Sequence, residues 1–114
     1  MSLSFLVNKC KELGRIGAAI VDPRSDVALS GALQAYEEGI LEPILVGPQA
    51  EIEKIAQDNN LDISKLQIID VATSELAAAA SAELASNGKV HCLVKGSLHT
   101  DILMHAVLQP EYNL

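Results

Sequence analysis

The turn from Lys95 to Thr100 carries the residue types best suited to binding an anion. Its six residues, which stand between an apolar run and a stretch of helical pattern, are Lys95-Gly96-Ser97-Leu98-His99-Thr100. Gly96 permits a tight turn and a close backbone approach to a ligand, while Ser97 and Thr100 offer hydroxyl groups and Lys95 adds a positive charge. The free N–H groups and the positive dipole end of the following helix point into the same space. The turn therefore predicts a site for phosphate or a carboxylate.

The same turn has a plainer interpretation as a helix start. Ser97 or Thr100 can serve only as the N-cap of the next helix, and His99 can cap or remain solvated. The sequence contains neither the GxxxxGK[ST] order of a P-loop nor a GxGxxG dinucleotide fingerprint. The residues alone leave both interpretations open.

Arg24 is a second candidate for anion binding. It follows an apolar run, in the segment Asp22-Pro23-Arg24-Ser25, and a guanidinium there can hold a neighbouring phosphate through two parallel hydrogen bonds. The alternative is a solvated loop arginine held by the flanking carboxylates of Asp22 and Asp26.

The histidines and cysteines indicate no metal or redox site. His91, His99 and His105 share no metal-ligand spacing, and the two cysteines, Cys10 and Cys92, lie in no CxxC pair. Two free thiols suit a reducing cytoplasm. A catalytic role for Cys92 is disfavoured, because burial in an apolar strand suppresses thiolate formation. No pair of carboxylates is placed for acid–base catalysis.

The elements that position these candidate residues are indicated by a repeated pattern in the sequence. An apolar run is followed by a turn and then by an amphipathic helix. The runs lack polar alternation and start roughly 25 residues apart, which suits strands buried on both faces of a parallel sheet with crossover helices. The predicted strands are Arg15 to Val21, Pro43 to Val46, Leu66 to Asp70 and Val90 to Val94. In such sheets ligands bind beyond the carboxyl ends of the strands, where both candidate segments lie.

Helix signals fill the intervals between the strands. Ser25 and Thr73 are expected N-caps, Gly39 is an expected stop, and Pro48 is expected in the first turn of its helix. The predicted helices are 5–13, 26–38, one that starts at 47–48, 74–86 and 101–108. We therefore expect one α/β unit over residues 1–114, a three-layer parallel sheet of about four strands with crossover helices.

Composition excludes several partners. Aromatic residues make up 3% of the chain, the net charge is −7 and no basic run occurs, so a nucleic-acid partner is not expected. Apolar stretches are far shorter than the roughly 20 residues that span a bilayer. We expect no signal peptide, because the amino terminus has no basic head followed by an apolar core. We expect a cytoplasmic protein without a membrane partner.

The order of several segments resembles the phosphate acetyltransferase and phosphate butyryltransferase family. The resemblance runs from about Ile16 to Leu114. Within the family, the chain most resembles the phosphotransacylase region of bifunctional enoyl-CoA hydratase and phosphate acetyltransferase proteins. The segments that carry it are Asp22-Pro23-Arg24-Ser25, Ala32-Leu33-Gln34-Ala35, Glu38-Gly39-Ile40, Pro43-Ile44-Leu45-Val46-Gly47, the turn from Lys95 to Thr100, and Ala106-Val107-Leu108.

The resemblance implies an enzyme that transfers an acyl group between phosphate and coenzyme A. The fold would be part of one related to isocitrate and isopropylmalate dehydrogenases, and the full-length enzyme would be a homodimer with its active site between two domains. Coenzyme A would be a substrate, with no tightly bound cofactor and no metal. Lys95, Gly96, Ser97 and Thr100 would bind phosphate or acyl phosphate, with Arg24 as a weaker candidate.

The chain departs from the family at two points, which keeps other functions open. The catalytic motifs expected near the family's carboxyl terminus have no counterpart, so the chain is expected to be an amino-terminal fragment, inactive alone, with its catalytic residues outside. The arginine usual in the helix after the glycine turn is replaced by Leu103-Met104-His105, which leaves butyryl-like substrates open. A non-catalytic module for phosphorylated ligands and an NAD-linked dehydrogenase are the alternatives.

Overall fold

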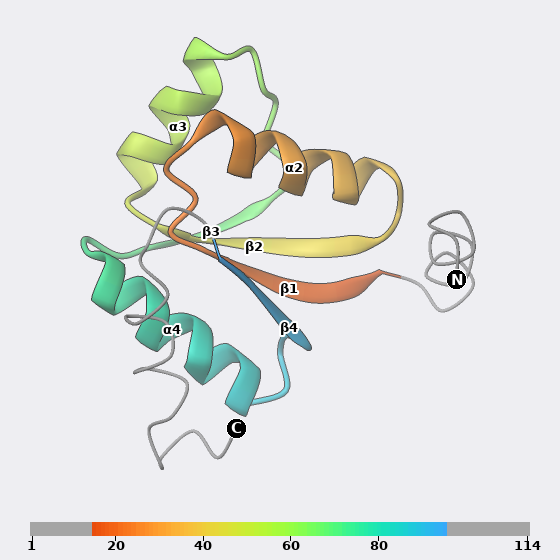
Figure 1. Cartoon of the computed structure of the whole chain (residues 1–114), viewed down its shortest axis with the longest axis vertical. Coiled ribbons are helices and arrows are strands. Elements are labelled where there is room, and N and C mark those ends of the chain that lie inside the picture. The colour runs from red at the N-terminus through yellow and green to blue at the C-terminus, as the bar shows by residue number, and fades with distance from the viewer. Residues whose placement is uncertain (1–14, 96–114) are drawn as a thin grey trace.

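Four parallel strands and three helices alternate over residues 15–95, the part of the chain that the computed structural model describes. The sheet order is β3-β2-β1-β4 (Figure 1). The elements are β1 (Ile16–Val21), α2 (Asp26–Glu37), β2 (Leu41–Gly47), α3 (Gln49–Asp58), β3 (Gln67–Asp70), α4 (Ser74–Ser86) and β4 (Cys92–Lys95). The predicted α/β fold with a parallel sheet is confirmed. The helices predicted at 5–13 and 101–108 lie outside the described residues.

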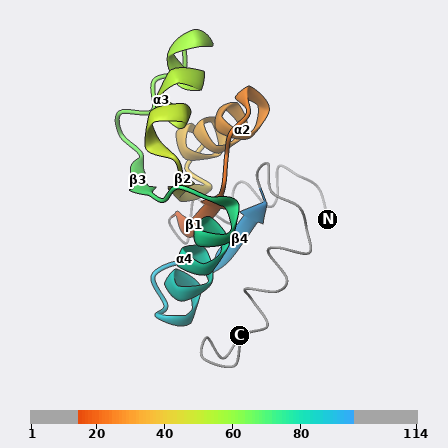
Figure 2. The ribbon, with the colours of Figure 1, turned by 90° about the vertical axis from the view of Figure 1, so that its left-hand side faces the viewer.

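The strands are apolar on both faces because helices cover both sides of the sheet. Ala18 and Ile20 of β1 pack with α2 and α3, whereas Ala19 and Val21 pack with α4. Figure 2 shows α2 and α3 on one side of the sheet and α4 on the other. The absence of polar alternation in the sequence follows from this three-layer arrangement.

Short-range signals set the helix boundaries. The side chains of Ser25 and Thr73 accept hydrogen bonds from the backbone N–H groups three residues on, each at 3.1 Å. The α2 helix ends one residue earlier than predicted, at Glu37, and Gly39 follows with φ +75°. The N–H groups of Gly39 and Ile40 return to the last turn of α2, each at 3.0 Å, which is a Schellman stop.

Pro48 does not lie in the first turn of α3, as the sequence predicted, but at the N-cap position. Its side chain cannot accept a hydrogen bond, so the cap comes from another part of the chain. Oδ1 of Asp70, at the end of β3, accepts the N–H of Gln49 at 3.0 Å. The helix therefore begins at the residue that Asp70 caps.

Replacing Gly17 with alanine should destabilise the sheet. A Cβ at Gly17 would lie 3.0 Å from the Lys89 carbonyl oxygen and 3.3 Å from the Val90 Cα, and backbone atoms cannot move aside as a flexible side chain does. We expect Gly17→Ala to lower the free energy of unfolding by about 1–3 kcal/mol, measured by urea denaturation.

Gly88 provides the control, since it has φ +74° but no atom lies within 4 Å of the position that a Cβ would take there. Asparagine tolerates this backbone conformation, so Gly88→Asn should change stability by less than about 1 kcal/mol. Equal losses in the two variants would show that space at Gly17 is not the cause.

Candidate functional site

The carboxyl ends of the strands meet at one edge of the sheet, as the sequence predicted. Val21 is in register with Val46 on one side and with Lys95 on the other, and Gly47 is in register with Asp70. The turn after β1, the start of α3, the start of α4 and the last residue of β4 therefore border one edge. This edge is where open parallel sheets bind ligands.

A polar network joins the turn after β1 to the N-terminus of α4. Nη2 of Arg24 donates to Oδ2 of Asp22 at 3.0 Å and to Oγ of Ser74 at 3.1 Å. The Ser74 hydroxyl donates to the same Asp22 oxygen at 2.6 Å. One carboxylate oxygen thus holds two segments that lie about 50 residues apart in the sequence.

Asp22 is the buried centre of this network. Its side chain is fully buried, and its φ of +54° lies in the left-handed region that aspartate visits more readily than most residues. Oδ1 lies 2.7 Å from Nε of Arg24. That contact lacks hydrogen-bond geometry, and no other polar group bonds Oδ1 within the described residues, so the short distance reflects charge attraction.

Arg24 is held by Asp22, one of the two flanking carboxylates that the sequence indicated, and no contact joins it to the other, Asp26, within the described residues. Its side chain is 34% exposed, and Nη1 donates to the exposed carboxylate of Glu51 at 3.2 Å. Hydrogen bonds to Asp22, then to Glu51, raise the pKa of Arg24 above its ordinary value. Because two carboxylates face one guanidinium, an anion at Arg24 would have to displace Glu51. The role of Arg24 in phosphate binding stays a prediction.

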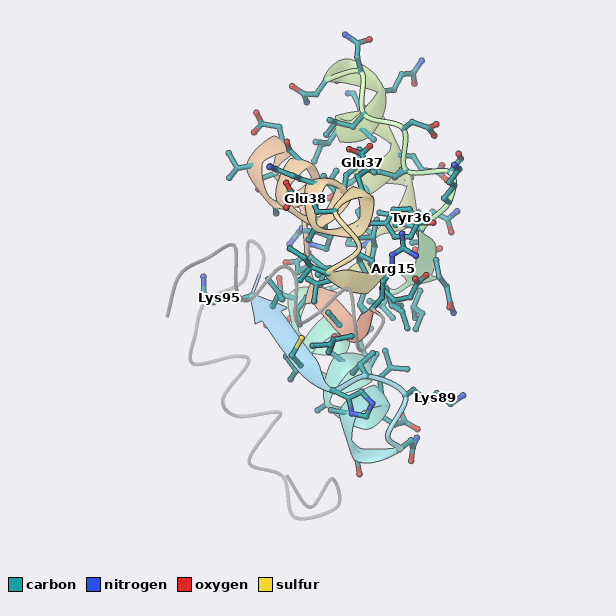
Figure 3. The ribbon with its side chains drawn as sticks, turned by 90° about the vertical axis from the view of Figure 1, so that its right-hand side faces the viewer. Arg15, Tyr36, Glu37, Glu38, Lys89 and Lys95 are labelled. Atoms are coloured by element: carbon teal, nitrogen blue, oxygen red, sulfur yellow. The ribbon has the colours of Figure 1, made fainter. Side chains whose placement is uncertain are left out.

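Lys95 is the one residue of the predicted phosphate turn that lies in the described part of the chain. It is the last residue of β4 and is exposed. Figure 3 shows it at the far end of β4 from Lys89. Gly96, Ser97, His99 and Thr100, together with His105, lie outside the described residues, so the geometry of the turn is not tested.

Cys92 and His91 show no catalytic arrangement. Burial raises the pKa of the Cys92 thiol, which disfavours the thiolate that a nucleophile requires. His91 is exposed, and its backbone N–H donates to the Gly17 carbonyl at 2.8 Å. Within residues 15–95, no three histidine, cysteine, aspartate or glutamate side chains form a metal cluster.

Sequence reasoning missed a second arginine contact, at the opposite edge of the sheet. Nε and Nη2 of Arg15 donate to the Tyr36 carbonyl at 3.3 and 3.1 Å, and the guanidinium lies 4.4 Å from the centre of the Tyr36 ring. Figure 3 shows these two side chains pointing toward one another. A cation there stabilises the negative end of α2.

The known proteins that this chain resembles are named phosphate acetyltransferase or phosphate butyryltransferase. A phosphate acetyltransferase of Rhizobium meliloti is 43% identical over 88 residues, which is 77% of this chain and 28% of that protein. A phosphate butyryltransferase of Clostridium beijerinckii is 31% identical over 116 residues, which is all of this chain and 38% of that protein. The chain belongs to the phosphate acetyl- and butyryltransferase family. It spans only about a third of the length of these relatives.

The fold comparison agrees with the family. The structure of EutD phosphotransacetylase from Staphylococcus aureus superimposes with a TM-score of 0.68 at 21% identity, over 85% of this chain and 38% of that one. No family model matches the chain. None of the helices described within residues 15–95 has the length and hydropathy needed to cross a membrane.

Proposed function

We propose that this chain is the amino-terminal part of a phosphate acyltransferase, which converts acyl-CoA and phosphate to acyl phosphate and CoA. The observation that carries this proposal is that relatives named phosphate acetyltransferase and phosphate butyryltransferase match 77 to 100% of the chain. Because the chain spans a fraction of their length, the activity is that of the full-length protein.

The reaction requires phosphate to be held and oriented next to a thioester. A phosphate oxygen attacks the acyl carbonyl, the carbon–sulfur bond breaks, and the CoA sulfur leaves with the electron pair. In this chain, Lys95, Gly96, Ser97 and Thr100 bind the phosphate, and orientation with charge stabilisation accounts for most of their effect. Coenzyme A is a substrate. The groups that handle the thiol proton lie outside these 114 residues.

The electrostatics of the sheet edge give Lys95 particular weight. Asp22, Glu51 and Asp70 are carboxylates at this edge. Arg24 is already paired with two of them, and Lys54 of α3 lines a hollow with Arg24 and Glu51. Binding of a phosphate dianion therefore needs a further positive charge at the edge. Lys95 supplies one at the end of the neighbouring strand.

We propose the remaining properties by analogy with the family. The full-length enzyme is a cytoplasmic homodimer that acts on acyl-CoA and phosphate, without nucleic-acid or membrane partners. Relatives named for acetyl and for butyryl transfer both match the chain. Its acyl group is therefore a short one, acetyl to butyryl.

An activity assay of the full-length protein tests the proposal. With acetyl-, propionyl- or butyryl-CoA, we expect CoA release that requires phosphate, followed through the free thiol. CoA release at the same rate with and without phosphate would contradict the proposal, and so would the absence of CoA release from all three substrates. Calorimetric binding of acetyl phosphate without turnover would instead favour a non-catalytic module.

A further inference from the structure

The Arg24 guanidinium is held firmly on its inner side. Its Nε and Nη2 face the Asp22 carboxylate, and Nη2 also donates to the Ser74 hydroxyl at 3.1 Å. Because Asp22 is fully buried, withdrawal of the guanidinium would leave a buried charge without the cation that contacts it. The guanidinium therefore stays in place, and an anion that binds Arg24 must approach the remaining nitrogen, Nη1.

Glu51 occupies that nitrogen and is held much less firmly. Its carboxylate accepts from Nη1 of Arg24 at 3.2 Å, and its side chain is 59% exposed. An exposed ion pair contributes little to stability, because water solvates both charges and the two side chains lose conformational freedom in pairing. Of the carboxylates that face Arg24, Glu51 is thus the one that an incoming anion can displace.

The position of Glu51 borders a hollow that carries a second cation. The hollow has a volume of about 540 Å³ and is lined by Arg24, Glu51, Lys54, Ile55 and Asp58. Lys54 is exposed and lies one helical turn after Glu51 on α3, so the two side chains are neighbours on the helix surface. Two cations and two carboxylates balance one another in this lining. When the Glu51 side chain turns into solvent, the positive charges are in excess.

We propose that Glu51 is an internal competitor for a phosphate group at Arg24. Its carboxylate takes the place of a phosphate oxygen at Nη1, and it turns into solvent when phosphate binds between Arg24 and Lys54. Phosphate is a suitable replacement, because an arginine binds either group through charge-assisted hydrogen bonds and phosphate offers more acceptor oxygens than a carboxylate. The proposal rests on the proposed function, since it takes this phosphate as the substrate of that reaction.

A purely structural role for Glu51 makes a different prediction. Glu51 is the acidic residue in the first turn of α3, where a negative charge stabilises the positive end of the helix. Loss of that charge would change the stability of the fold but not its affinity for phosphate. Phosphate affinity is therefore the measurement that separates the two roles.

Glu51→Gln in the full-length protein tests the proposal. Glutamine keeps the shape of the side chain but removes the charge that competes with phosphate at Arg24. We expect the KM for phosphate to fall about 2- to 5-fold, the range spanned by the loss of an exposed ion pair, with the KM for acyl-CoA unchanged. Titration calorimetry with inorganic phosphate, in the absence of acyl-CoA, should show the same fall in Kd.

Two further variants locate the effect. Glu53→Gln removes the same charge from the same helix, at an exposed residue that accepts from the Gln49 side chain at 2.9 Å, and should leave the phosphate Kd unchanged. Lys54→Met removes the second cation of the hollow and should raise the phosphate Kd about 2- to 5-fold in the Glu51→Gln background.

Three results would overturn the proposal. They are a phosphate Kd in Glu51→Gln that is unchanged or higher, an equal fall in Glu53→Gln, and no effect of Lys54→Met. The calorimetric measurement needs no turnover, so it separates this proposal from the acyltransferase assignment. An active enzyme whose phosphate Kd does not respond to Glu51→Gln would refute only the competitor role. Tighter phosphate binding in an enzyme that transfers no acyl group would support that role and refute the assignment.

Discussion

Arg24→Gln should lower the free energy of unfolding by about 3 kcal/mol, the largest stability loss that we expect from a change at the sheet edge. The guanidinium is the only cation among the described residues that contacts the fully buried Asp22 carboxylate. Removing one member of a buried ion pair leaves an uncompensated charge, which costs about 3–5 kcal/mol. Because Arg24 is 34% exposed, the lower end of this range applies. Urea denaturation measures the effect.

Two further variants show whether the buried charge is the cause. Asp22→Asn combined with Arg24→Gln removes both charges, so the double variant should be more stable than Arg24→Gln alone. Arg15→Gln removes the exposed guanidinium that contacts Tyr36. It should lower the free energy of unfolding by less than about 1 kcal/mol. A double variant no more stable than Arg24→Gln would contradict the assignment of Asp22 as the centre of the network.

Lys95→Met should raise the KM for phosphate about 10- to 100-fold in the full-length enzyme. Charge-assisted hydrogen bonds contribute about 1.5–3 kcal/mol. At this edge Arg24 is already paired with Asp22 and Glu51, so a phosphate beside β4 would depend on the charge of the exposed Lys95. Lys95→Arg keeps the charge and should recover a large part of the loss. Initial rates at varied phosphate and saturating acyl-CoA separate KM from kcat.

Lys89→Met is the matched control, because Lys89 is an exposed lysine that lies three residues before β4 begins, away from Lys95 (Figure 3). Its kinetics should equal those of the unchanged enzyme. If Lys95→Met leaves the KM for phosphate unchanged while the enzyme remains active, Lys95 is not part of the phosphate site. Loss of activity with phosphate binding intact would assign Lys95 a role in the chemical step instead.

The features that the sequence predicted are those decided by neighbouring residues. Non-alternating aliphatic runs indicated the parallel sheet, since such runs are stable only when both faces are covered. Ser25, Thr73 and Gly39 marked helix boundaries because a cap or a left-handed stop acts over three or four residues. The convergence of the turns at the carboxyl edge follows from parallel strands alone.

The sequence indicated Asp22 as a partner of Arg24, but it could not indicate the other two, because they are remote in the sequence. Glu51 lies 27 residues away and Ser74 lies 50 residues away, and only the strand order brings them to one place. The sequence did contain a signal for the left-handed backbone conformation of Asp22, because aspartate is enriched at positive φ and a tight turn follows the strand. Nothing local indicated that its carboxylate would be buried.

By itself, then, the sequence determined the α/β class, the positions of the helices and the resemblance to the acyltransferase family, because periodicity, capping and motif order are local properties of a chain. Only the tertiary structure decided that Asp22 is buried, that Arg24 also pairs with Glu51, that Asp70 caps α3, and that Val94 of β4 lines an apolar groove with α2. These outcomes depend on strand order and register. Contacts between distant segments fix that order and register, so no window of neighbouring residues contains them.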